Sequence, residues 1–319
     1  MMTYKCFRLI LIAIIVLLAC GRIYQTAGVR LDAKQYLPVG KLYSIGRDKM
    51  HLYTGGSGDV TVVFAAGWGT VNPVVDFYPL YEETATYAKY VVYDRFGYGY
   101  SELTSRTRQI DTMIDEIHEL LGKASLKPSY ILVGHSLASL ECIRYAQRYP
   151  EEVKGIVLID GGNPEFYANA KPITWLSYVQ GQLVNFGIAR LLYKIDGFDR
   201  FSNSERNQLR LLPEDLKRVD KLATLLKANN RNITDEMKRS QENAKVVIGG
   251  GRIDAPLTII TSGDFGNASK AWLASQHDLL SWSTMSKQVV VNDSRHYIHH
   301  YHPEIIIKEI VELRGKTGR

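Results

Sequence analysis

Short apolar runs alternate along this chain with longer segments in which apolar residues recur at helical spacing. The runs are four to seven residues long and are typical of strands: 60–66, 90–94, 130–133, 155–160, 256–261 and 287–291. One helical stripe between them consists of Ile110, Met113, Ile114, Ile117, Leu120 and Leu121. Continuous apolar strands are typical of parallel sheets that are covered on both faces. The pattern therefore predicts an α/β fold, with a mostly parallel central sheet and helices on both faces.

The N-terminal segment has a different apolar pattern. Thirteen uncharged residues lie between Arg8 and Arg22, and as a helix they would be about 20 Å long, short of the roughly 30 Å hydrocarbon core of a membrane. The stretch from Lys5 to Tyr24 is long enough if basic side chains at both ends reach the interface. Three interpretations stay open: a retained signal anchor, lipoprotein processing at Cys20, and a cleaved secretion signal. A retained anchor predicts a single-pass cell-membrane protein, and all three place the remaining chain outside the cytoplasm.

Composition and charge narrow the class of protein further. The chain has 319 residues and a formal net charge of +6, which suits one large domain with an insertion. Four basic residues precede the first acidic residue, Asp32: Lys5, Arg8, Arg22 and Arg30. Removing that +4 leaves only +2 for the rest of the chain, so we expect no nucleic-acid partner. Three scattered cysteines provide neither a disulfide framework nor a metal-ligand spacing: Cys6, Cys20 and Cys142.

A serine stands at a strand-to-helix turn in the middle of the chain. Ser136 follows the run 130–133 through Gly134 and precedes a helix-like segment at Ala138. Such a turn exposes the central hydroxyl at the top of a sheet, and it needs small residues two positions before and two after the serine. Gly134 and Ala138 meet that requirement, so Ser136 is the candidate nucleophile. A serine between small residues is also common by chance, so the surrounding motifs must decide.

Four further motifs accompany the serine turn. They are an Asp-Ala-x-x-Tyr-x-Pro-x-Gly-like segment at 32–40, Ala66-Gly67, an Asp-Arg-x-Gly-Tyr-Gly-x-Ser loop at 94–101, and a Trp-x-x-x-Gln-x-x-Leu-x-x-x-Ser run at 272–283. In these motifs the chain resembles the α/β-hydrolase superfamily, and more narrowly a group of membrane-anchored bacterial serine α/β-hydrolases. The resemblance covers residue 31 to the C-terminus and is weakest between 163 and 252. It implies the α/β-hydrolase fold and a Ser-His-Asp triad.

The resemblance also places an oxyanion hole. In this fold one backbone N–H donor belongs to the residue after the nucleophile, which is Leu137 here, and the second follows an upstream strand. The glycine-rich turn after the run 60–66 puts Trp68 in that second position.

A histidine after the last strand is expected to be the catalytic base. Four histidines crowd that loop: His296, His299, His300 and His302. In similar hydrolases the base lies seven residues before a Pro-Glu pair that opens the final helix, and Pro303-Glu304 thereby favours His296. Proline suits a first helical turn, because its missing N–H would have no partner there. The four histidines also resemble a metal-ligand cluster, but no matching carboxylate–histidine helix motif occurs elsewhere, and we expect neither a metal nor a cofactor.

Two aspartates compete for the role of the acid. Asp160 ends the run 155–160 and lies 24 residues after Ser136, a spacing similar to that in haloalkane dehalogenases. Asp264 follows the run 256–261, close to the position that most hydrolases of this fold use. The anchored group tends to carry aspartate at the position of Asp160, which slightly favours that residue. Either carboxylate could instead belong to an ordinary turn.

The segment between the strands that end at Asp160 and Thr261 has helical character. One apolar stripe there holds Trp175, Val179, Leu183 and Phe186, and a second helix opens at Pro213. An insertion in this position predicts a cap over Ser136. The expected organisation is an N-terminal segment at 1–25, a linker at 26–39, the hydrolase core at 40–162 and 253–319, and the helical cap at 163–252.

These features predict a serine hydrolase that cleaves a carboxylic ester or a similar acyl substrate through an acyl-enzyme. Apolar cap residues favour an apolar acyl or leaving group on a small-molecule substrate. Aminopeptidase, thioesterase and acyltransferase chemistry are the alternatives among enzymes. A receptor-type pseudohydrolase is the alternative outside them, because this fold hosts many functions.

Overall fold

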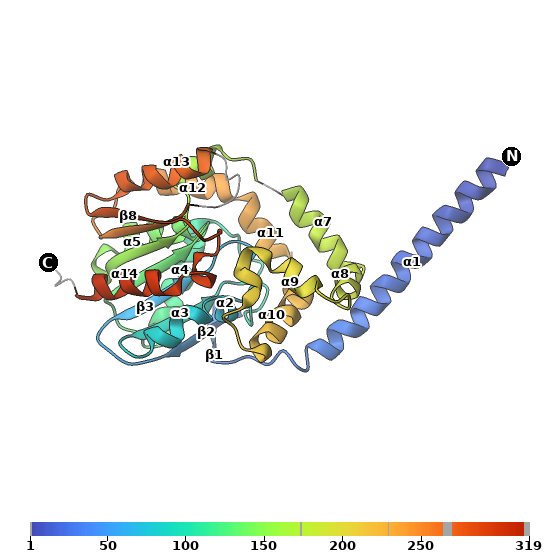
Figure 1. Ribbon diagram of the computed structural model, residues 1–319, viewed down its shortest axis with the longest axis horizontal. Helices are drawn as coiled ribbons and strands as arrows, with labels where there is room; N and C mark the ends of the chain where they lie inside the picture. Colours follow the sequence, from blue (N-terminus) through green and yellow to red (C-terminus); the bar gives the residue numbers. More distant parts are fainter. Residues whose placement is uncertain (1, 173, 229, 264–269, 316–319) are drawn as a thin grey trace.

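Within the described residues, eight strands form one central sheet (Figure 1). The computed structural model describes residues 2–172, 174–228, 230–263 and 270–315. The strands lie in the order β1-β2-β4-β3-β5-β6-β7-β8. The strand β2 runs in the opposite direction to all the others, and every pair that does not involve β2 is parallel. Their bounds are β1 Lys41–Ile45, β2 Asp48–Gly55, β3 Thr61–Ala65, β4 Lys89–Asp94, β5 Tyr130–His135, β6 Val153–Ile159, β7 Leu257–Ser262 and β8 Ser286–Val291. The predicted α/β fold with a mostly parallel sheet is confirmed.

The sheet is buried on both faces because its central strands are mostly apolar. On β5, Leu132 belongs to one apolar cluster, whereas Ile131 and Val133 belong to another on the opposite face. Successive side chains of a strand point to opposite faces, so a continuous apolar run supplies both clusters at once. Each fully buried aliphatic side chain contributes roughly 1.5–3 kcal/mol relative to its exposed state.

Helices cover the two faces of the sheet. Residues of α4 (Ile110–Lys123) and α5 (Ala138–Arg148) contribute to the first cluster, and residues of α3 (Tyr78–Thr84) and α14 (Pro303–Gly315) to the second. The predicted stripe on 110–121 lies on the buried side of α4. The remaining short elements of the core are α2 Pro73–Asp76, α13 Lys270–Asp278, and the 3₁₀ turns η1 Pro150–Glu152, η3 Leu279–Trp282 and η4 Ile298–His300.

A run of helices separates β6 from β7, in the segment where an insertion is expected. These helices, which we call the cap, are α6 Pro164–Asn169, α7 Thr174–Asn185, α8 Ile188–Leu192, α9 Phe198–Ser202, the 3₁₀ turn η2 Ser204–Leu209, α10 Glu214–Lys227, α11 Arg231–Lys238 and α12 Ser240–Gly249. The stripe predicted on α7 is not buried as a unit, because Trp175 is 68% exposed and Val179 is 44% exposed.

The N-terminal part of helix α1 (Met2–Asp32) extends away from the sheet and the cap, whereas its C-terminal part lies against the cap (Figure 1). By length and composition it is able to cross a membrane, with a mean hydropathy of 2.4 in its most apolar window. The helix continues through 26–32, into the segment expected to be a linker. Tertiary contacts explain the difference, since Gln25 and Asp32 on α1 both pair with Arg190 of the cap.

Candidate active site

Ser136 occupies a sharp turn between β5 and α5. Its φ is +54°, a left-handed value that is rare for residues other than glycine. Its N–H donates to the carbonyl of Ile159 on the adjacent strand at 3.0 Å. A Cβ atom at Gly134 would lie 2.6 Å from Cys142 Sγ, so only glycine allows α5 to start this close to β5. The local sequence thus turns the chain so that Ser136 lines a cavity.

His296 and Asp160 are brought together from the loops that follow β8 and β6. The Nδ1 atom of His296 lies 2.6 Å from Oδ2 of Asp160, although the residues are 136 positions apart. Asp160 directly follows β6, is fully buried, and has a φ of +44°. Because β5, β6 and β7 are adjacent and parallel, their carboxyl ends meet at one edge of the sheet. The competing acid, Asp264, lies outside the described residues.

Three further N–H groups converge on the Asp160 carboxylate. Gln276 Nε2 donates to Oδ1 at 2.7 Å, and the Ser262 N–H donates to the same oxygen at 3.0 Å. The Trp272 indole Nε1 donates to Oδ2 at 3.3 Å. Trp272 and Gln276 are one helical turn apart on α13 and therefore share a face. The Trp-x-x-x-Gln spacing was visible in the sequence, but nothing in it indicated that both side chains orient the same carboxylate.

The backbone N–H groups of Trp68 and Leu137 lie at the two loops expected for an oxyanion hole. Among the described residues neither N–H donates to a protein acceptor, and both residues line the cavity that contains Ser136 and His296. The Trp68 side chain is held by the cap, since its indole Nε1 donates to the carbonyl of Ile233 at 2.8 Å. These two donors are thus available to a bound oxyanion.

Arg95 fixes the turn that carries Trp68. Its buried guanidinium donates to the carbonyls of Ala66 at 2.8 Å and Gly67 at 3.3 Å. Glu141 and Glu236 lie 3.4 Å and 3.3 Å from the same guanidinium and balance its charge. Through Arg95, the Asp-Arg-x-Gly-Tyr-Gly-x-Ser loop therefore holds the turn that carries Trp68 by hydrogen bonds to its backbone. The sequence motif alone did not indicate this role.

Tyr167 of α6 is a second residue near the serine that sequence reasoning missed. Its hydroxyl is within hydrogen-bonding reach of the Ser136 and Ser139 side chains, and burial raises the pKa of Tyr167. It belongs to an apolar wall of the cavity formed with Phe166, Trp272 and Met237. No spacing in the sequence connects Tyr167 with Ser136, because only the chain reversal after β6 brings α6 over the serine.

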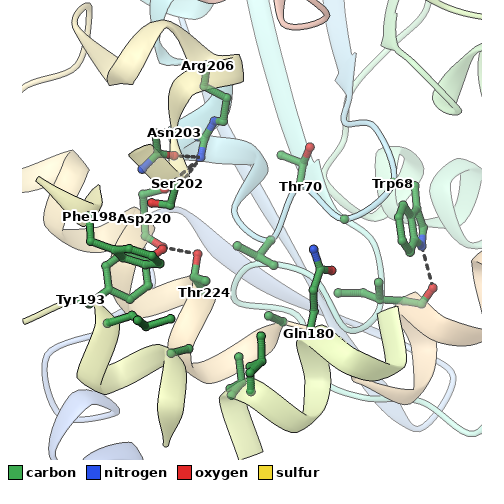
Figure 2. A pocket seen from close by; sticks show the side chains of 18 of the residues that line it. Trp68, Thr70, Gln180, Tyr193, Phe198, Ser202, Asn203, Arg206, Asp220 and Thr224 are labelled. Atoms are coloured by element: carbon green, nitrogen blue, oxygen red, sulfur yellow. Dashed lines mark hydrogen bonds and ion pairs between the residues drawn. The ribbon is translucent and has the colours of Figure 1, made fainter. Parts of the chain in front are cut away.

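Two cavities meet beside the serine. The first, of about 420 Å³, contains Ser136 and His296. The second, of about 440 Å³, lies under α7, α8 and α9, and Trp68 and Tyr297 line both. Figure 2 shows Trp68 at one side of the second cavity and Arg206 with Asn203 and Asp220 at the other.

Two other histidines of the C-terminal loop, His299 and His300, form a buried network around Asp76. His299 Nε2 and His300 Nε2 lie 2.9 Å and 3.1 Å from the two oxygens of that carboxylate. These three residues offer ligand atoms within 4.8 Å of one another. Arg206 Nε also lies 3.1 Å from Asp76, and a guanidinium at this distance disfavours a divalent cation by charge repulsion. The network instead joins the histidine loop to α2 and the cap.

Acidification is expected to destabilise the fold through this network. Burial lowers the pKa of His300 to about 4. Burial and the neighbouring His296 and His299 charges lower the pKa of His135. Burial alone would raise the pKa of Asp76, but His299 and Arg206 hold it well below its usual value.

The sign of the effect follows from proton uptake. An unfolded histidine takes up its proton near pH 6.5, whereas the buried rings of His135 and His300 take up theirs only at lower pH. The free energy of unfolding therefore falls as the pH drops from about 6.5 to 4. His300 alone contributes a decrease of about 3 kcal/mol over that range. Urea titrations at several pH values measure it. His300→Gln, which cannot titrate, should show a shallower dependence, and an unchanged slope would contradict the assignment.

Comparison with known proteins identifies the family. The sequence profile described as alpha/beta hydrolase fold matches residues 61–303. This chain belongs to the α/β-hydrolase family. It is 30% identical over 317 residues to YbdG, an uncharacterized protein of Bacillus subtilis, covering 96% of this chain and 95% of that protein.

Solved structures share the fold of this α/β hydrolase. Cfl2 from Burkholderia cenocepacia superposes with a TM-score of 0.67 at 17% identity, covering 85% of this chain and 94% of that one. The enol-lactonase from Burkholderia xenovorans LB400 superposes with a TM-score of 0.65 at 14% identity, covering 86% and 100%. At these identities the likeness shows the fold alone.

Proposed function

We propose that this protein is a serine hydrolase that cleaves a carboxylic ester through a covalent acyl-enzyme. The observation that carries the proposal is that a strained serine and a histidine from separate loops line one cavity, with a buried aspartate paired to the histidine. The family contains hydrolases of several kinds, so the site rather than the fold supports the choice.

The geometry supports a defined sequence of proton transfers. Asp160 would hold the Nδ1–H of His296, which leaves Nε2 as the base that accepts the Ser136 proton while Oγ attacks the ester carbonyl. The N–H groups of Trp68 and Leu137 would stabilise the oxyanion. His296 would then give the proton to the departing alkoxide, and water would hydrolyse the acyl-enzyme with His296 again as base.

The lining of the cavities supports an apolar acyl or leaving group. Phe166, Trp272 and Met237 form part of the wall beside Ser136. Leu183, Val184 and Leu192 line the second cavity. The second cavity also has a polar side, formed by Asn203, Arg206 and Asp220, so the preference for an apolar group rests on the wall beside Ser136. Apolar walls favour ligands that bury hydrocarbon.

Covalent labelling tests the nucleophile directly. A fluorophosphonate probe should modify Ser136 stoichiometrically, because only an activated serine displaces fluoride from such a probe. Peptide mapping by mass spectrometry locates the adduct. Labelling should disappear in Ser136→Ala, and an adduct on any other serine would overturn the assignment.

We further propose that α1 anchors the protein in the cell membrane with the catalytic domain outside the cytoplasm.

Full-length protein is expected to partition with membranes, because the exposed apolar side chains of Leu9–Leu18 have no protein partner among the described residues. A chain that begins at Arg22 keeps the contacts between α1 and the cap, and is expected to be soluble and active. Fractionation measures both, and the mass of the mature protein separates a retained anchor from processing at Cys20. Full-length protein found wholly in the soluble fraction would contradict the anchor.

A further inference from the structure

The C-terminal part of α1, from Gly21 to Asp32, packs against the cap. Arg22 Nη1 donates to Asn185 Oδ1 of α7 at 3.0 Å, and Gln25 Nε2 donates to the Leu225 carbonyl of α10 at 3.0 Å. Arg190 of α8 pairs with Asp32 at 2.6 Å. A Cβ atom at Gly21 would clash with the carbonyl of Phe186, so glycine allows the backbones to touch there. These contacts hold the C-terminal part of α1 against the cap.

The length of the apolar segment places this contact at the membrane surface. From Lys5 to Tyr24 the helix spans about 30 Å, which is the thickness of a hydrocarbon core. The shorter uncharged stretch that ends at Gly21 does not reach across. A spanning α1 therefore brings Gly21 and Tyr24 to the interface, the same turn that touches the end of α7 and the start of α8.

Helix α7 presents different faces to the cavity and to the outside. Gln180 and Val184, spaced at i and i+4, line the second cavity. Trp175, Tyr178 and Val179, spaced at i, i+3 and i+4, are exposed by 68%, 68% and 44%, and this spacing places them on one side of the helix. Figure 1 shows α7 lying across the direction of α1, with its C-terminal end near that helix. Exposed tryptophan and tyrosine are the side chains that bilayer interfaces favour.

We propose that the outer face of α7, formed by Trp175, Tyr178 and Val179, docks on the surface of the bilayer that α1 spans. The inference rests on the proposed membrane anchor and goes beyond it, because a simple anchor requires no contact between the cap and lipid. The partner is the lipid interface itself, in which an apolar helix face is buried by about 5–10 Å. Docking makes α7 the wall between the lipid and the second cavity, so an ester dissolved in the bilayer lies one helix away from Trp68.

Tryptophan fluorescence in vesicles tests the docking. Full-length protein is reconstituted into phosphatidylcholine vesicles whose lipids carry bromine near the top of the acyl chains, a quencher that acts only on contact. Trp272 and Trp282 are buried and Trp68 is half-buried, whereas Trp175 is exposed. We expect part of the emission to be quenched, and Trp175→Phe to lose that quenched part.

Two matched variants in the Trp175→Phe background locate the contact. Tyr178→Trp should restore quenching, because it returns an indole to the same face. Val290→Trp should not, although Val290 is 55% exposed, because β8 is the far edge strand of the sheet. Quenching that is unchanged by Trp175→Phe, or restored equally by both variants, would overturn the docking.

Failure of the docking is distinguishable from failure of the proposals on which it rests. Vesicle flotation in the same samples reports the anchor, and protein that does not float refutes the anchor and the docking together. Protein that floats without quenching dependent on Trp175 refutes the docking alone. Hydrolysis of a soluble aryl ester reports the chemistry at Ser136 independently of both.

Discussion

Ser136→Ala is expected to lose about 10⁴-fold or more of ester turnover while the fold stays intact. The hydroxyl is the only group that this substitution removes. Without it His296 has no serine proton to accept, and no acyl-enzyme can form. Alanine keeps the small Cβ that the turn at φ +54° already accommodates. Steady-state hydrolysis of an aryl ester measures the loss, and circular dichroism checks the fold.

Ser139→Ala is the matched control for this substitution. Ser139 lies one helical turn further on, is fully buried, and donates to the Gly162 carbonyl at 2.7 Å. Removing its hydroxyl leaves a carbonyl without its partner and costs about 1–3 kcal/mol of stability, with turnover kept within about tenfold. Equal losses in the two variants would indicate that a structural role explains both. Full activity in Ser136→Ala would refute the proposed nucleophile. If the unsubstituted protein binds an ester but never hydrolyses it, the receptor-type alternative is favoured.

Asp160→Asn is expected to approach a loss of about 10⁴-fold in kcat, as known for the corresponding change in serine proteases. The hydrogen bonds around the carboxylate determine how the new amide is oriented. Oδ1 accepts from both Gln276 Nε2 and the Ser262 N–H, so the amide oxygen takes that side. The amide NH₂ then faces His296 and forces Nδ1 to accept a hydrogen bond. The proton of the neutral ring moves to Nε2, which can no longer take the proton of Ser136.

Asp264→Asn separates the two candidate acids. If Asp160 is the acid, this substitution should cost no more than about tenfold in kcat, or about 1.4 kcal/mol on the barrier. Burst kinetics and the pH profile of kcat distinguish a lost base from a change in binding. The reverse pattern would transfer the role to Asp264, and two mild effects would mean that neither carboxylate orients His296.

Local patterns in the sequence determined the fold and the candidate nucleophile. Strand-length apolar runs predicted the mostly parallel sheet, because a strand buried on both faces must be apolar at every position. Gly134, Ser136 and Ala138 indicated the sharp turn, because its backbone geometry depends only on small neighbours within two residues. Pro303 marked the start of α14, because proline suits a first helical turn. His296 was favoured by resemblance, from its spacing to the Pro303-Glu304 pair in similar hydrolases.

Only the tertiary structure decided which groups surround these residues. The contact between His296 and Asp160 depends on the order of β5, β6, β7 and β8 in the sheet, and the hydrogen bond from Gln276 to Asp160 closes a loop of 116 residues. Pairings of this kind are set by strand order and by the loops that follow each strand, and no short spacing in a sequence encodes them. The same reason explains why the packing of α1 against α7, α8 and α10 could not be predicted. The apolar run of α1 was evident from the sequence, but its contacts depend on how a cap some 160 residues away is folded.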